Sequence, residues 1–88
     1  MNAKLKHSPL CSRDGGCELY FTVKKDAAKF RVTVPRDMLD DACGQAATEA
    51  SRKAWAKANM PTMLQIVEKR PNTVNQPPFN QILVEEIS

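Results

Sequence analysis

The sequence predicts an α+β fold, an antiparallel sheet of three to four strands packed on one long or kinked helix, in the order β-β-α-α-β. Three observations predict it. The 88 residues have room for a single domain, 1–88. Apolar and polar residues alternate in two neighbouring segments, as they do in the strands of a hairpin. After Pro35 the apolar spacing changes to three or four residues, which is typical of one face of a helix.

The first 17 residues are expected to be irregular or to form a loose edge strand. The segment His7-Ser8-Pro9 disfavours regular structure, and Arg13-Asp14-Gly15-Gly16 is a turn signal. A short edge strand fits between Lys4 and Cys11.

A β-hairpin is the clearest structural signal in the chain. Its first strand is expected over 18–24 and its second over 30–34, with Arg31 and Thr33 pointing outward. A polar loop of about five residues, which includes Lys25-Asp26-Ala27-Ala28, joins them. The residues expected on the apolar face are Leu19, Phe21, Val23, Phe30, Val32 and Val34.

Two helical segments are predicted beyond the hairpin. Asp37 is expected to cap the first, with Asp40 and Asp41 in its first turn, and Gly44 is expected to end it. A longer helix is expected over 45–58. Its buried stripe is expected to contain Ala47, Ala50, Ala54, Trp55 and Ala58. The side chains expected to face water are Glu49, Arg52, Lys53 and Lys57.

Proline residues divide the rest of the chain. Pro61 must kink or restart the helix, because it lacks an N–H. The pattern from Met60 to Arg70 favours a helix, although alternating apolar residues within it leave a strand as the alternative. A loop over 71–78 then leads to a strand over 81–87. Both faces of that strand are partly apolar, which indicates pairing inside the sheet or cover by a second subunit.

Short segments of the hairpin and the helices together resemble a known family. The hairpin segments concerned are Leu19-Tyr20-Phe21-Thr22 and Phe30-Arg31-Val32-Thr33-Val34. With Leu39 in the first helix, the aromatic Trp55 in the long helix and a short final strand, the chain over 18–87 resembles a family of short bacterial proteins catalogued only as a domain of unknown function. That family commonly has a Trp-Asp pair before its first strand, where Arg13-Asp14 stands here. The resemblance implies a fold and no activity.

Composition and charge exclude several classes of protein. Hydrophobic residues make up 42% and charged residues 26%, which argues against disorder. No stretch approaches the roughly 20 apolar residues that cross a bilayer, and the N-terminus lacks the apolar segment of a signal peptide. We therefore expect a cytoplasmic protein without membrane contact. The net charge of +3 permits an acidic partner without requiring one.

His7, Cys11, Cys17 and Cys43 are the only soft metal-ligand set. Together they could offer zinc three sulfurs and one nitrogen. However, five residues separate Cys11 from Cys17, whereas zinc knuckles usually hold their cysteines two to four residues apart. Ordinary thiols are therefore expected, with no metal and no cofactor, and a Cys11–Cys17 disulfide is a further alternative.

No arrangement of residues indicates catalysis, so the protein is expected not to be an enzyme. The single histidine, His7, could act as a base for Cys43 only if the fold brings the two together. Helix-end electrostatics explain Asp40-Asp41, and Glu85-Glu86 keeps the final strand soluble. A phosphate-binding nest at Arg13-Asp14-Gly15-Gly16 is a weaker interpretation than a turn.

Basic residues form two groups in the sequence, one around the hairpin tip and one on the outer face of the long helix. They are Lys24, Lys25, Lys29 and Arg31, and Arg52, Lys53 and Lys57. The leading hypothesis is a non-enzymatic interaction domain that binds a protein partner, or itself as a homodimer, through its sheet. The alternative is weak, sequence-independent nucleic-acid binding by the two basic groups, with Tyr20 available to stack on a base.

Overall fold

The predicted hairpin is present in the computed structural model as β3 (Glu18–Lys25) and β4 (Ala28–Val34). Its turn is tighter than the sequence predicts, because Lys25 pairs with Ala28 and only two residues lie outside the ladder. The first of these, Asp26, has a φ of 53°, a left-handed value that its short polar side chain tolerates. The expected five-residue loop is therefore wrong.

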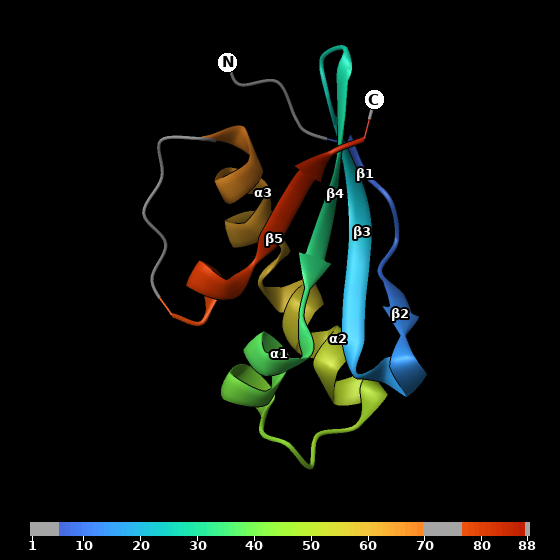
Figure 1. Ribbon diagram of the computed structural model, residues 1–88, viewed down its shortest axis with the longest axis vertical. Coiled ribbons are helices and arrows are strands. Elements are labelled where there is room, and N and C mark those ends of the chain that lie inside the picture. Colours follow the sequence, from blue (N-terminus) through green and yellow to red (C-terminus); the bar gives the residue numbers. More distant parts are fainter. Residues whose placement is uncertain (1–5, 70–76, 88) are drawn as a thin grey trace.

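The described residues, 6–69 and 77–87, form a five-stranded antiparallel sheet with three α-helices (Figure 1). β1 (Lys6–His7) and β2 (Cys11–Arg13) both pair with the edge of β3 that β4 leaves free. β5 (Leu83–Glu86) pairs with the other edge of β4. The α+β fold is thus confirmed, and the loose edge strand expected near the N-terminus is two short strands.

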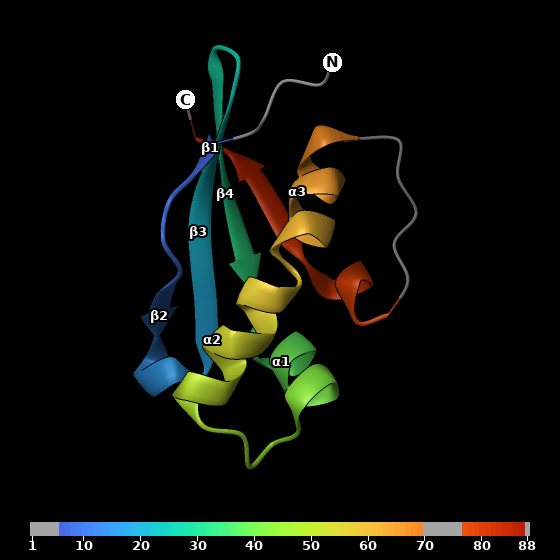
Figure 2. The same ribbon diagram turned by 180° about the vertical axis from the view of Figure 1, so that it is seen from behind.

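Three helices follow β4: α1 (Arg36–Cys43), α2 (Glu49–Ala58) and α3 (Met60–Glu68). Figure 2 shows α2 and α3 in front of one face of the sheet, and α1 near the end at which β4 finishes. Only Asn59 separates α2 from α3, and Pro61 lies in the first turn of α3, where its missing N–H is not needed. The segment that begins at Met60 is therefore a helix, and the predicted break lies at Asn59.

The first helix begins two residues earlier than the sequence predicts. Its N-cap is Pro35, with an extended backbone, and no side chain caps the helix. Asp37 lies inside the first turn, and Asp40 and Asp41 lie beyond it. The predicted end is confirmed, since Gly44 has a φ of 92° and its N–H bonds the carbonyl of Asp40.

The second helix begins four residues later than expected, because Thr48 and Ser51 form a capping box. The Ser51 N–H donates to the Thr48 hydroxyl at 3.1 Å, and the Thr48 N–H donates to the Ser51 hydroxyl at 3.1 Å. These bonds satisfy two backbone donors that a helix start otherwise leaves unpaired.

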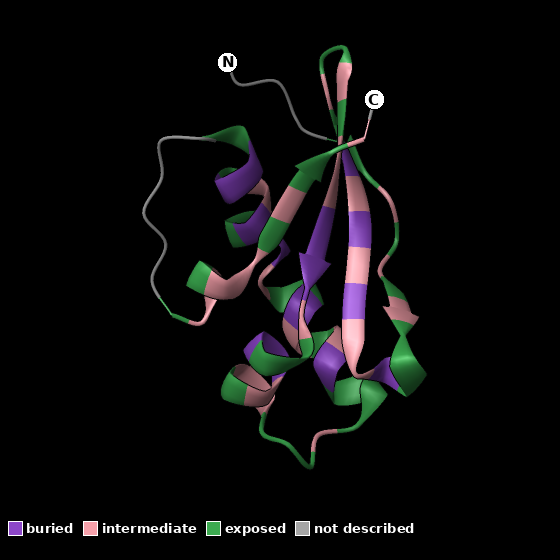
Figure 3. Ribbon diagram, viewed as in Figure 1, coloured by how far each residue is buried: buried purple, intermediate pink, exposed green. Residues whose placement is uncertain are grey.

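The core lies between the sheet and the helices. All six apolar hairpin residues face it, five of them fully buried and Phe30 partly so. Figure 3 shows the alternation of buried and half-buried residues along β3. The other buried apolar residues are Met38, Leu39, Ala56, Met60, Met63, Ile66 and Val67. In addition, Thr33 points outward as expected but is only 8% exposed, because Tyr20 and Leu83 flank it on the neighbouring strands.

The buried stripe predicted for the long helix is wrong. Ala50, Ala54 and Ala58 are exposed, and Ala47 and Trp55 are half-buried. The buried residues of α2 are instead Arg52 and Ala56. Trp55 stacks on Phe79, with ring centroids 5.7 Å apart, in the short 3-10 turn η2 (Phe79–Gln81) that precedes β5. Because the Trp55 side of α2 faces this turn, the adjacent side of the helix, which carries Arg52 and Ala56, faces the core.

The final strand is shorter than predicted and is the outermost strand of the sheet. It therefore pairs on one side only within the described part of the chain. The loop predicted over 71–78 lies outside the described residues except for Pro77 and Pro78. None of the helices between residues 6 and 69 is long and apolar enough to span a bilayer.

Candidate binding surface

The sheet has one face that no described helix covers, and we call it the open face. Figure 1 looks onto it, with α2 and α3 behind the strands. Side chains of directly paired residues point to the same face, so the register identifies its members. They are Lys6, Cys11, Arg13, Glu18, Tyr20, Thr22, Lys24, Lys29, Arg31, Thr33, Leu83 and Glu85.

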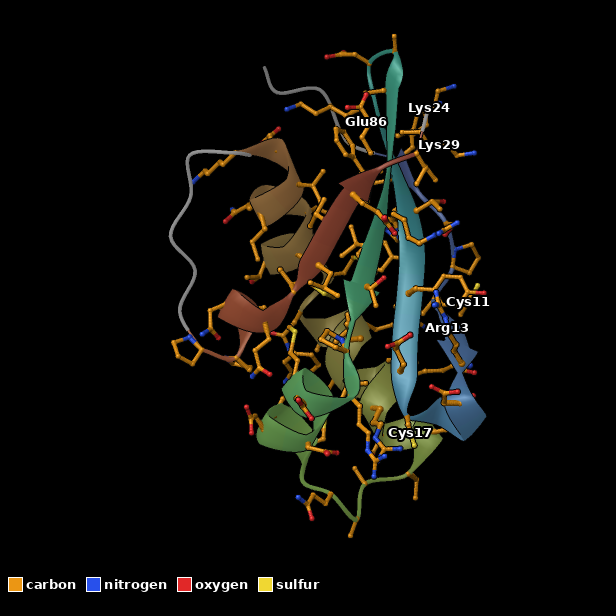
Figure 4. All side chains as sticks on the ribbon, viewed as in Figure 1. Cys11, Arg13, Cys17, Lys24, Lys29 and Glu86 are labelled. Atoms are coloured by element: carbon orange, nitrogen blue, oxygen red, sulfur yellow. The ribbon has the colours of Figure 1, made fainter. Side chains whose placement is uncertain are left out.

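Three lysines lie in one row across the open face. Lys24 of β3 pairs with Lys6 of β1 on one side and with Lys29 of β4 on the other. All three are exposed, and Figure 4 shows Lys24 and Lys29 close together near the hairpin end of the sheet. Adjacent strands lie about 4.8 Å apart, so the row spans roughly 10 Å.

The lysine row has no counter-charge of its own. None of the three ammonium groups forms a hydrogen bond or an ion pair with any residue of 6–69 or 77–87. Like charges placed directly opposite one another destabilise a sheet. The row therefore costs stability, and an anion held above it would offset that cost.

The next basic side chain of the open face is partly neutralised. Arg31 forms an ion pair with Glu85 of β5, with 3.7 Å between Nη1 and Oε1. Both side chains are well exposed, at 42% and 64%, so the pair is weak and a stronger anion can compete for Arg31.

An aromatic site lies farther along the same face. The guanidinium carbon of Arg13 lies over the ring of Tyr20, 4.4 Å from its centroid. Arg13 Nε also pairs with Glu18 Oε1 at 3.3 Å, which holds the guanidinium in place. The site thus combines a ring, a planar cation and a fixed orientation, on the edge strand β2 and its neighbour β3.

The open face carries an excess of positive charge. By the strand register it holds five basic and two acidic residues. The other described residues, within 6–69 and 77–87, carry six basic and eight acidic side chains. Among the described residues, positive charge is therefore concentrated on the open face of the sheet.

The predicted basic residues do not form a single surface. Lys25 lies on the helical side of the sheet, where its ammonium donates to the carbonyl of Glu68 at 2.9 Å. On α2, Lys53 pairs with Glu49 at 3.2 Å and Lys57 is exposed to solvent. The other residues of the hairpin group, Lys24, Lys29 and Arg31, lie on the open face, opposite the helix group, so the two groups do not form one continuous track for a phosphate backbone.

Arg52 is a correction to the sequence analysis, because it is buried instead of facing water. Its Nη1 donates to the carbonyl of Gly16 at 3.2 Å, and its Nε has no acceptor among the described residues. It therefore ties α2 to the turn between β2 and β3 and is not available to a ligand. A second link lies beside it: Ser12 donates to Glu49 at 2.8 Å, and this bond and Lys53 lower the pKa of the Glu49 carboxyl.

The residues considered as metal ligands are not brought together. Cys11, Cys17 and Cys43 are free thiols, and no three His, Cys, Asp or Glu side chains within 6–69 and 77–87 gather as a metal site. His7 packs edge-on against Phe21 on the helical side of the sheet, 6.1 Å between ring centroids. Burial raises the pKa of the Cys43 thiol, and the positive charge of Arg52 offsets part of this increase.

His7 and Cys43 do not form a nucleophile–base pair. β1, which carries His7, and α1, which ends at Cys43, lie at opposite ends of the molecule (Figure 1).

Sequence reasoning identified Lys24, Lys29 and Arg31 but missed Lys6 and Arg13 as members of the same surface. The expected edge strand already contained Lys6. What the sequence does not contain is the position of that strand beside β3, since nothing local specifies which edge it joins.

No family model, curated protein or solved structure matches this chain. The resemblance to the family of short bacterial proteins therefore stays a prediction.

Proposed function

We propose that the protein binds nucleic acid through its phosphate backbone, with the open face as the contact surface. The observation that carries this proposal is the row of Lys6, Lys24 and Lys29. Within the described part of the chain these lysines are exposed and have no counter-charge, and they lie on a face with five basic and two acidic residues. Phosphate groups in series provide the spaced negative charges that such a row attracts.

The chemistry of the row favours binding without sequence preference. A lysine ammonium is a compact point charge that meets a phosphate without reading a base edge. Contacts of this kind release counterions, so the affinity falls steeply as salt rises.

The test is the affinity for a fluorescent thymidine oligonucleotide of about 15 nucleotides, measured by anisotropy at several salt concentrations. Replacing Lys24→Gln and Lys29→Gln together removes two contacts. We expect the slope of log affinity against log salt to become shallower by about 1.4 on a single strand.

The matched control carries the same loss of charge on the helical side, with Lys57→Gln and Lys69→Gln, both exposed. We expect it to bind as the unchanged protein does. Absence of binding at low salt, or an equal loss in both variants, would overturn the proposal. Displacement of the oligonucleotide by poly-glutamate at equal charge would indicate an acidic protein partner instead.

The free edge of β5 supports a second candidate, self-association by sheet extension. Ile87 N donates to the carbonyl of Lys29 at 2.8 Å. Since backbone direction alternates along a strand, Val84 and Glu86 turn their N–H and C=O groups away from β4. Leu83, beside them, is 59% exposed, the most exposed large hydrophobic residue of the described chain. An edge of this kind can pair with the same strand of a second copy.

This second candidate predicts a dimer in sedimentation experiments, and one substitution tests it. Glu86→Pro removes an N–H that points away from β4, so the sheet of one copy keeps its bonds and only the pairing between copies is lost. We expect Glu86→Pro to be monomeric and Glu86→Ala, the control, to remain dimeric. A monomer in the unchanged protein would exclude this candidate.

A further inference from the structure

Tyr20 and Arg13 form the one aromatic feature of the open face. Tyr20 is half-buried in the middle strand β3, and the Arg13 guanidinium lies over its ring, 4.4 Å from the centroid. The Arg13 side chain is 45% exposed, so part of it remains accessible to solvent. Unpaired bases stack on aromatic rings, tyrosine among them, and on the planes of arginine guanidinium groups.

We infer that the nucleic acid bound by the open face is single-stranded, with one base stacked on the site that Tyr20 and Arg13 form. This inference rests on the proposed function, which it refines by naming the class of ligand. It joins two independent features of one face, the lysine row for phosphates and the aromatic site for a base.

The position of the two features fits one extended strand. Tyr20 and Lys24 lie four residues apart on β3 and point to the same side, which separates their Cα atoms by about 13 Å. A base on Tyr20 and phosphates on the lysine row therefore belong to nucleotides a short distance apart in one strand. In a duplex, bases are stacked on one another and are not available to an aromatic ring without being flipped out.

The shape of the surface also favours a single strand. The major groove of a duplex admits a helix or a ribbon of two strands. The open face is wider than this, because β1 or β2, β3, β4 and β5 lie side by side in it (Figure 1). A sheet of this width offers a platform over which a flexible strand can lie.

The experiment compares three ligands of similar charge: the thymidine oligonucleotide, a duplex of the same length and inorganic polyphosphate, which has no bases. The variant Tyr20→Leu removes the ring, and Tyr20→Phe keeps it as the matched control. Circular dichroism and thermal unfolding establish that each variant is folded before binding is measured.

We expect the single strand to bind tighter than the duplex. Tyr20→Leu should weaken single-strand binding roughly 5- to 100-fold and leave binding of polyphosphate unchanged, whereas Tyr20→Phe should bind all three ligands as the unchanged protein does. The ring protons of Tyr20 should shift upfield in nuclear magnetic resonance spectra with the oligonucleotide and not with polyphosphate. This shift supplies a readout that does not depend on the Leu variant.

The outcomes separate the two proposals. Equal affinity for duplex and single strand, or an unchanged single-strand affinity in Tyr20→Leu with no ring shift, would overturn the stacking inference and leave backbone binding standing. Absence of binding to all three ligands would overturn both.

Discussion

Arg52 shows how one side chain joins two distant segments of this small protein. A long charged residue in the middle of a helix is ordinarily solvated, and the sequence of α2 gives no sign that this one is different. It is buried because its guanidinium meets the carbonyl of Gly16, a residue that is itself buried and has a φ of 92°. A Cβ at Gly16 would lie 2.7 Å from Cβ of Glu49, so only glycine allows the turn to approach α2 this closely.

The role of Arg52 can be measured by its removal. Arg52→Ala leaves the buried carbonyl of Gly16 without its donor and leaves a gap beneath α2. We expect a loss of about 1–3 kcal/mol in the free energy of unfolding, measured by urea denaturation. Lys57→Ala, on the exposed side of the same helix, is the control and should change stability by less than about 0.5 kcal/mol. A similar effect in both variants would contradict this role.

The sequence predicts some elements better than others. An element is predictable when neighbouring residues specify it, and it is not when a contact with a distant residue decides its orientation. The hairpin is confirmed because alternation over a few residues specifies both its strands and their common face. The sequence of α2 does not determine which side of the helix faces the core, because alanines lie on several sides and more than one side could be buried. The stacking of Trp55 on Phe79, 24 positions later in the sequence, decides between these faces, and no pattern within α2 contains that contact.

The start of α2 depends on a short signal that the sequence does contain. Thr48 and Ser51 cap the helix, although serine stands where a capping box usually has Glu or Gln, and the pattern was therefore missed. Thr48→Ala removes the acceptor of the Ser51 N–H. We expect it to destabilise the protein by about 1 kcal/mol in thermal or urea unfolding.

The control for this element is Thr62→Ala. Thr62 is exposed in α3 and caps nothing, so we expect a change of at most about 0.5 kcal/mol. Equal effects of the two substitutions would show that the capping bonds do not stabilise α2.

At the scale of the whole molecule, the sequence predicts which residues belong to the binding surface better than it predicts how they are arranged. Lys24 and Lys29 were identifiable because they flank a hairpin turn. Lys6 completes their row only because β1 pairs with β3, which brings together residues 18 apart in the sequence. That the α2 lysines lie on the other side depends on which face of the sheet the helices cover, which alternation in the hairpin does not reveal.

The separation of charge between the two layers has a consequence for how the molecule meets a polyanion. Among the described residues, the open face has an excess of basic side chains and the rest of the molecule an excess of acidic ones, so the protein is an electric dipole with its positive end on the open face. In the field of a polyanion the protein experiences a torque that turns the open face toward the polyanion before contact, so a larger fraction of collisions occurs in the binding orientation. Such steering raises the rate of association more than it slows dissociation, and added salt weakens it first.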